Sequence, residues 1–274
     1  MERLSLAFLA LLHQVSVGSL IPLLFLEGVG KRGFFKLVAL TALFLEGIAL
    51  GIQLRCSMLD VRCWSLGSGV LFLLLLAIFT AFLFLKDERR SSPSLRSGQR
   101  LFLRLALLGG AVHLFLAALP FASHQSLVTS HQPPVLLILS FFTSALFLGS
   151  VVTAMLLGHW YLVEPGLSIR PFKRLTALYL GSGLLQGFVV LVSTLFGILG
   201  GPASKMALAT YQYALIGRIG LGIFLPLSVG ALVWETLKIP HTQAATGLLY
   251  VAILLVVAGE LLGRYLLVTS LIPL

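Results

Sequence analysis

The sequence predicts an all-α integral membrane protein with eight transmembrane helices. Hydrophobic residues make up 58% of the 274 residues and charged residues only 10%, whereas a soluble domain carries about 25% charged residues. The apolar residues fall into eight runs, each near the ~20 residues that a membrane-spanning helix requires. No stretch between the runs is long enough for a soluble domain, so we expect a single polytopic membrane domain over residues 1–274.

The first four spans are bounded by basic or polar segments. The first run follows Arg3 and continues beyond the roughly 7–15 residues of a signal-peptide core, with no A-x-A-like cleavage site after it, so we expect a retained helix. Lys31-Arg32 separates it from the second run, and the polar segment Lys86 to Arg100 divides the third from the fourth. The expected spans are about 4–26, 34–54, 64–85 and 101–123.

The last four spans are separated by Pro- and Gly-containing segments. Pro133-Pro134 precedes the fifth run, and Gly200-Gly201-Pro202 follows the sixth. Proline and glycine are typical of such turns. The expected spans are about 135–160, 175–198, 213–236 and 245–270, and we expect the eight helices to form two four-helix bundles packed by small residues.

Lysine and arginine predict the orientation. Thirteen of these side chains lie in or beside the loops after spans 1, 3, 5 and 7, and five lie on the opposite side. Because cytoplasmic loops carry the excess of Lys and Arg, both termini are expected outside the cytoplasm. The net charge of +10 is explained by this asymmetry, and no basic patch with interleaved aromatic residues indicates a nucleic-acid partner.

Two cysteines lie in the short loop between spans 2 and 3. Cys56 and Cys63 fall on the side that the charges place outside the cytoplasm, where disulfides form, so they are a candidate disulfide. Two free thiols remain the alternative. No metal site is expected, because two cysteines without nearby histidines fall short of the four ligands of a structural zinc ion.

Ionisable residues inside the spans are the candidate functional residues, because such groups are costly in hydrocarbon. Glu260 and Arg264 lie one helical turn apart in the last span, and Arg218 lies near the outer end of the seventh. We expect a single outward-facing polar pocket that joins them to His13 if spans 1, 7 and 8 adjoin. The other candidate binding residues are Gln14 and Glu46.

These residue types suit a quinone site, because quinone reduction takes two electrons and two protons. Histidine donates or accepts a hydrogen bond near neutral pH, a buried carboxylate can exchange protons, and an arginine can orient it. In this hypothesis His13 binds the quinone carbonyl, Glu260 exchanges the proton and Arg264 fixes Glu260. The alternative is that Glu260 and Arg264 neutralise each other and only fix helix packing.

The last span, with Gly259-Glu260-Leu261-Leu262-Gly263-Arg264, resembles the final helix of the membrane anchor subunit of dimethyl sulfoxide reductase, which belongs with the polysulfide-reductase-type membrane subunits. The resemblance implies an eight-helix anchor in the cytoplasmic (inner) membrane that binds menaquinone or ubiquinone and carries no haem. It also implies two partners outside the cytoplasm, an iron–sulfur electron-transfer subunit and a molybdenum-containing catalytic subunit. Such a chain is either non-catalytic or quinone-reactive, and the terminal substrate belongs to another subunit.

The chain departs from this family at two places. The family's His-Leu-Gly-x-Pro stretch after the second span is replaced by residues 54–60, and a family glutamate that serves quinol has no clear counterpart. Glu46 or His13 is the expected substitute if the quinone site is kept. The segment Gly158-His159-Trp160-Tyr161 matches nothing in the family.

Two other classes of membrane protein remain as alternatives. A b-type cytochrome is suggested by His13, His113 and His159 inside spans, because imidazole is a usual haem ligand; the first two come closest in depth. A secondary transporter would also place ionisable residues near the midplane. Such transporters commonly show inverted repeats and broken helices, whereas the sequence shows no internal repeat and few Pro or Gly breaks in paired positions.

Overall fold

The structure is a computed structural model that describes residues 2–26, 32–56, 63–84, 93–128, 133–164, 167–199, 202–239 and 241–270. All regular secondary structure in these segments is helical, and eight helical stretches are long and apolar enough to cross a membrane. The all-α membrane class and the eight spans predicted from the sequence are therefore confirmed. The helices are α1 Glu2–Phe25, α2 Arg32–Cys56, α3 Cys63–Phe84, α4 Pro93–Val128, α5 Pro134–Val163, α6 Arg170–Leu199, α7 Pro202–Thr210, α8 Gln212–Ile219, η2 Gly220–Phe224, α9 Leu225–Thr236 and α10 Thr242–Ser270.

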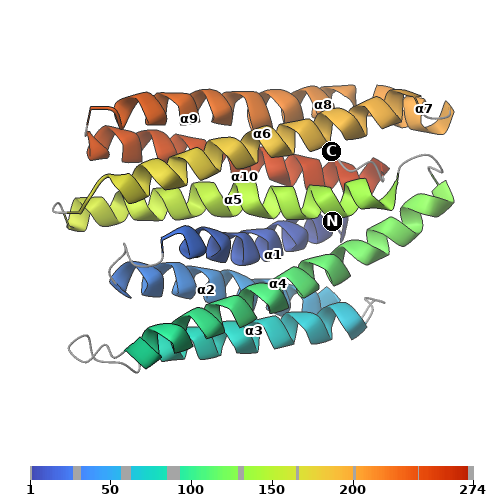
Figure 1. Ribbon diagram of the computed structural model, residues 1–274. Helices are drawn as coiled ribbons and strands as arrows, with labels where there is room; N and C mark the ends of the chain where they lie inside the picture. Colours follow the sequence, from blue (N-terminus) through green and yellow to red (C-terminus); the bar gives the residue numbers. More distant parts are fainter. Residues whose placement is uncertain are drawn as a thin grey trace.

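Helices α1 and α5 form the centre of the molecule. In each of their apolar segments 72% of the residues are buried, against 33–39% in the other six spans. Figure 1 shows α1 between α2 and α5, and α1 also contacts α4 and α10. A polar side chain on α1 therefore faces other helices on most sides, whereas the outer faces of the peripheral helices carry leucine and phenylalanine toward the lipid.

The backbones of α1 and α5 touch where both helices carry small residues. A Cβ atom at Gly18 would overlap the backbone of Ala145, and one at Gly149 would overlap the backbone of Gly18. Small residues allow this close approach in membrane helices, where the lipid supplies no hydrophobic drive for helices to associate. Close by, the Thr153 hydroxyl donates a hydrogen bond to the Ser19 carbonyl (3.1 Å). This crossing fixes the register of the two central helices.

The seventh span contains a π-helical turn, η2. Pro226 has no N–H and cannot bond the Gly222 carbonyl four residues earlier, and the Leu225 N–H bonds the carbonyl of Gly220, five residues back. The widened turn packs on α10, where a Cβ atom at Gly259 would overlap Gly222. The irregular turn thus brings the end of α8 against α10, one residue from Glu260.

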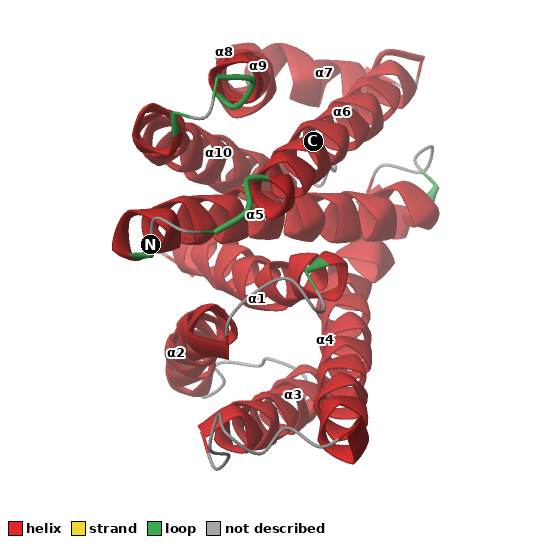
Figure 2. Cartoon of the chain, turned by 60° about the vertical axis from the view of Figure 1, so that its left-hand side comes forward, coloured by secondary structure: helices red, strands yellow, loops and turns green. Residues whose placement is uncertain are grey.

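Helix α4 is the longest element, with 36 residues, and it crosses the bundle obliquely (Figures 1 and 2). At about 1.5 Å per residue it measures roughly 54 Å, well beyond the ~30 Å hydrocarbon layer. Its oblique course lets it contact α3, α1 and α5. In this way a residue in the middle of α4 can reach α1.

The candidate disulfide falls outside the described part of the chain. Cys56 ends α2 and Cys63 begins α3, but the connecting residues 57–62 and both cysteine side chains are not described. The pairing of Cys56 and Cys63 stays a prediction.

Candidate functional site

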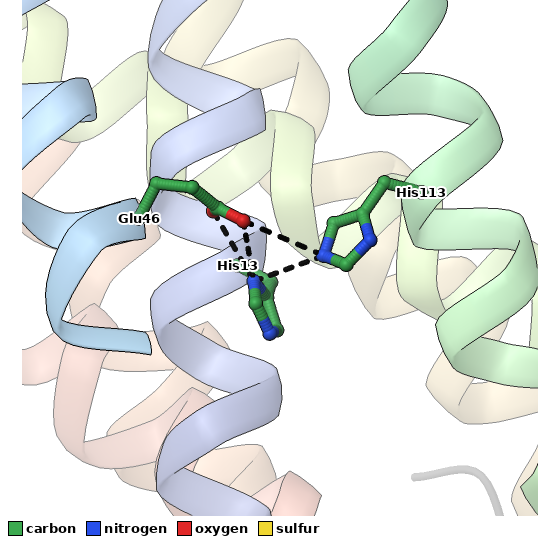
Figure 3. Close-up of side chains that lie close together, drawn as sticks. All are labelled: His13, Glu46 and His113. Atoms are coloured by element: carbon green, nitrogen blue, oxygen red, sulfur yellow. Dashed lines mark hydrogen bonds and ion pairs between the residues drawn. The ribbon is translucent and has the colours of Figure 1, made fainter. Parts of the chain in front are cut away.

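Three buried side chains from α1, α2 and α4 meet in what we call the histidine–glutamate cluster: His13, Glu46 and His113 (Figure 3). His13 Nδ1 lies 3.0 Å from Glu46 Oε1 and 3.0 Å from His113 Nε2. His113 Nε2 lies 3.6 Å from the same carboxylate oxygen. The exposed fractions are 3% for His13 and 0% for the other two. The cluster is therefore a polar site inside the helix bundle.

A serine on α3 orients His113. The Ser68 hydroxyl lies 3.0 Å from the backbone carbonyl of Ser65, which can only accept a hydrogen bond, and 3.0 Å from His113 Nδ1. With the Ser68 proton directed to that carbonyl, we assign the His113 proton to Nδ1, which donates to Ser68. The lone pair of His113 Nε2 then points into the cluster.

One atom of the cluster is free to meet a ligand. The hydrogen bonds of His13 to described residues all involve Nδ1. Nε2 has no hydrogen-bond partner among the described residues, and it is not completely enclosed by protein atoms. In Figure 3 this nitrogen points away from Glu46 and His113. Beside Glu46, Gly47 and Gly51 expose the backbone of α2, and a Cβ atom at either would meet nothing within 4 Å.

Three further charged side chains form the arginine–glutamate cluster: Arg218, Glu260 and Arg264. Arg218 Nη2 donates to Glu260 Oε1 at 2.8 Å, whereas the nearest nitrogen of Arg264 is 3.9 Å from Glu260 Oε2. The pair one helical turn apart in the sequence is therefore the looser contact, and the close partner of Glu260 comes from α8. All three side chains are at most 1% exposed.

Side chains of α5 and α1 complete the arginine–glutamate cluster. The Ser144 hydroxyl lies within hydrogen-bonding distance of Glu260 Oε2 and of Gln14 Oε1. Arg264 donates to the backbone and side-chain oxygens of Ser140 and lies over the Phe141 ring. Three guanidinium nitrogens in the cluster have no partner among the described residues: Arg218 Nε, Arg218 Nη1 and Arg264 Nε.

Helix α1 separates the two clusters. The sequence predicted one pocket with His13, Arg218, Glu260 and Arg264, and the structure brings the last three together but places His13 with Glu46 and His113. The reason is the helical geometry of α1, because neighbouring residues point about 100° apart. His13 faces α2 and α4, while Gln14 faces α5, where it bonds Phe141 and Ser144.

The geometry bears on the cytochrome alternative and on metal ligation. The imidazole rings of His13 and His113 are in direct edge-to-face contact, with centroids 4.3 Å apart, so no haem plane fits between them in this arrangement. The sequence predicted no metal site, whereas His13, Glu46 and His113 present ligand atoms that all lie within 4.8 Å of one another. The structure thus assembles a set of metal-ligand types that the sequence did not predict.

Sequence reasoning left His113 and Ser68 out of the site. His113 lies 100 residues from His13, and no local pattern shows that α4 crosses α1. Its central position in a span was the available signal, because an intramembrane histidine marks a functional candidate. Ser68 gave no signal, since serine is common in membrane helices.

The segment that resembled nothing in the anchor family has a packing role. Trp160 covers Gly33 on α2 and donates from Nε1 to Glu164 at 3.2 Å. Tyr161 donates to the Ser168 carbonyl, and His159 lies 3.3 Å from the Tyr250 hydroxyl. These contacts close the end of α5 against its neighbours, far from both clusters.

Comparisons of the chain with protein-family models, with curated proteins and with solved structures found no match. The two buried clusters therefore carry the functional argument.

Proposed function

We propose that this chain is the quinone- or quinol-interacting membrane subunit of a multi-subunit oxidoreductase, and that the quinone ring binds at the histidine–glutamate cluster. The observation that carries the proposal is the free Nε2 of His13 within a buried polar site in a membrane span. A quinone is a ring with two carbonyl oxygens on an apolar tail, so its site combines a hydrogen-bonding side chain with access from the lipid.

We propose that the ring enters from the lipid beside α2. Gly47 and Gly51, close to Glu46 in the sequence, lie on the exposed side of α2, and a Cβ atom at either would meet nothing within 4 Å. A flat ring would pass along this bare backbone toward His13. His13 Nε2 would bond one oxygen of the ring: it donates to a quinone carbonyl when it carries the proton, and accepts from a quinol hydroxyl when Nδ1 carries it. Glu46 and His113 hold the His13 ring in place through Nδ1.

The arginine–glutamate cluster has a different place in this proposal. Glu260 is occupied by Arg218 and Ser144 and lies across α1 from His13, so direct contact with the ring falls to His13. Among the described residues, the hydrogen bonds that link Glu260 to α1 run through Ser144 and Gln14. Its proposed role is to hold α1, α5, α8 and α10 together and to shape the wall behind the ring.

The partners in this proposal come from the resemblance to the dimethyl sulfoxide reductase anchors. Reduction of the quinone takes up two electrons and two protons, and oxidation of the quinol releases them. The electrons would come from an iron–sulfur partner outside the cytoplasm in the first case and go to it in the second. A molybdenum-containing subunit would then act on the terminal substrate. The ring is menaquinone or ubiquinone, in the cytoplasmic membrane.

The test is quinone binding by the purified full-length protein in detergent. We expect wild type to bind decylubiquinone or a short-chain menaquinone with one site per chain, measured by calorimetry, and His13→Phe to bind at least about 10-fold more weakly, which corresponds to the ~1.4 kcal/mol of one hydrogen bond. His159→Gln, which changes an exposed histidine outside both clusters, is the matched control and should bind as wild type does. Equal affinity of His13→Phe and wild type, or no binding by wild type, would refute the proposal.

A further inference from the structure

The ligand atoms of the histidine–glutamate cluster form a compact triangle with two equal sides and one longer side. Its sides are 3.0 Å (His13 Nδ1 to Glu46 Oε1), 3.0 Å (His13 Nδ1 to His113 Nε2) and 3.6 Å (His113 Nε2 to Glu46 Oε1). A tetrahedral ion with bonds of about 2.0–2.2 Å to nitrogen and oxygen holds its ligands about 3.3–3.6 Å apart. The longest side matches this spacing, and the other two are slightly shorter, so small movements of the His13 ring would bring all three atoms to it.

Hydrogen-bond acceptors outnumber donors at the centre of the histidine–glutamate cluster. His113 Nε2 carries a lone pair in the assigned tautomer, because its other nitrogen donates to Ser68. Both carboxylate oxygens of Glu46 lie 3.0–3.1 Å from His13 Nδ1. Both oxygens of Glu46 and the lone pair of His113 therefore surround one nitrogen of His13, which carries at most one proton. A cation between the three side chains would satisfy all of these acceptors at once.

We propose that His13 Nδ1, Glu46 and His113 Nε2 bind one divalent transition-metal ion of the zinc–iron class. Two imidazoles and one carboxylate are the protein ligands of many catalytic zinc sites and of non-haem iron sites, which keep a position open for another ligand. Ser68 supplies the outer-shell hydrogen bond that such histidines almost always make. The carboxylate cancels one of the two positive charges, which lowers the cost of the ion in a buried site.

The metal ion would also set the role of His13 in quinone binding, and this part of the inference rests on the proposed function. A histidine that binds a metal through Nδ1 must carry its proton on Nε2. The free nitrogen of His13 would then be a fixed hydrogen-bond donor, aimed at the quinone carbonyl. Without the ion, Nδ1 would hold the proton for Glu46 and Nε2 would only accept.

The experiment titrates Co²⁺ into chelator-treated, full-length protein purified through a tag without histidines. No quinone is present, so metal binding is measured independently of the proposed function. We expect one equivalent of Co²⁺ per chain, with visible ligand-field bands that added Zn²⁺ removes. Glu46→Gln and His113→Gln should bind at least about 100-fold more weakly, and His159→Gln should match wild type.

A second variant keeps the test decisive if ligand substitutions prevent folding. Ser68→Ala leaves all three ligands in place and should weaken Co²⁺ binding about 10- to 100-fold, as the loss of an outer-shell partner does. Unchanged affinity in Ser68→Ala, binding retained in a folded Glu46→Gln protein, or no stoichiometric binding by wild type would each overturn the metal site. Quinone binding that persists after any of these results would leave the proposed function standing.

Discussion

At the scale of single residues, Glu260 lies between two arginines within the membrane-spanning part of the bundle. Arg218 donates to it at 2.8 Å, and Arg264 lies 3.9 Å away and is anchored on Ser140. All of these groups are withdrawn from water and lipid. Removing one charge of a buried ion pair is costly, because the remaining charge keeps its desolvation penalty and loses its partner.

We therefore expect Glu260→Gln to lower the free energy of unfolding by about 3–5 kcal/mol, the range for breaking a buried pair. Thermal unfolding of the purified protein in detergent measures the effect as a lower apparent Tm. Glu235→Gln is the matched control, because Glu235 pairs with Lys238 at an exposed site with 62% and 58% of the side chains accessible, and such pairs contribute about 0–1 kcal/mol. An equal shift in the two variants would contradict the importance of the buried pair.

The residue scale also shows which part of the site the sequence could reveal. An ionisable residue within an apolar run can be recognised from the sequence alone. This is how the candidates were found: His13, Glu46, Arg218, Glu260 and Arg264. Their pairing is not visible in the sequence. Arg218 is 42 residues from Glu260 but lies closest to it in space, whereas Arg264, four residues away on the same helix, is the looser contact. Which face of α1 carries each polar group decides that His13 and Gln14 belong to different clusters.

At the scale of helices, the contact between α1 and α5 organises both clusters. His13 and Gln14 point about 100° apart on α1, one turn before Gly18, where the backbones of α1 and α5 touch. A shift of α1 along α5 would move His13 relative to Glu46 and Gln14 relative to Ser144 together. The spans themselves were predictable from the sequence because apolar runs are local, but this crossing depends on small residues whose partners lie over 100 residues away.

We expect Gly18→Val to disrupt the bundle, because the added side chain would overlap the backbone of α5 near Ala145, with no flexible atom to move aside. The expected result is a sharp loss of monodisperse protein in size-exclusion chromatography and a destabilisation above the 1–3 kcal/mol that is typical of overpacking. Gly47→Val, at a position with nothing within 4 Å of the new Cβ atom, should behave like wild type. Normal yield and Tm for Gly18→Val would show that the helices do not cross there.

At the scale of the whole molecule, eight spans, being an even number, predict both termini on the same side of the membrane, and the charge asymmetry predicts which side. Thirteen of the nineteen Lys and Arg residues fall in or beside the sequence segments after spans 1, 3, 5 and 7, and the positive-inside rule predicts that this side faces the cytoplasm. His13 lies nine residues after Leu4, the first residue of the first span, or about 13 Å along the helix. The proposed ring site would then lie in the outer half of the bilayer, within reach of a partner outside the cytoplasm.

Reporter fusions measure this orientation. We expect alkaline phosphatase fused after Leu274 to be active and green fluorescent protein at the same position to be dark, because the first folds only outside the cytoplasm and the second only inside. Fusions in the basic segment 86–92 should give the opposite pair of signals and serve as the internal control. Fluorescence of the C-terminal fusion would mean that the protein has the opposite orientation. Both clusters would stay intact, but the ring site would lie in the cytoplasmic half of the bilayer. The iron–sulfur partner would then have to dock from the cytoplasm, and the likeness to the dimethyl sulfoxide reductase anchors would no longer support the proposed assembly.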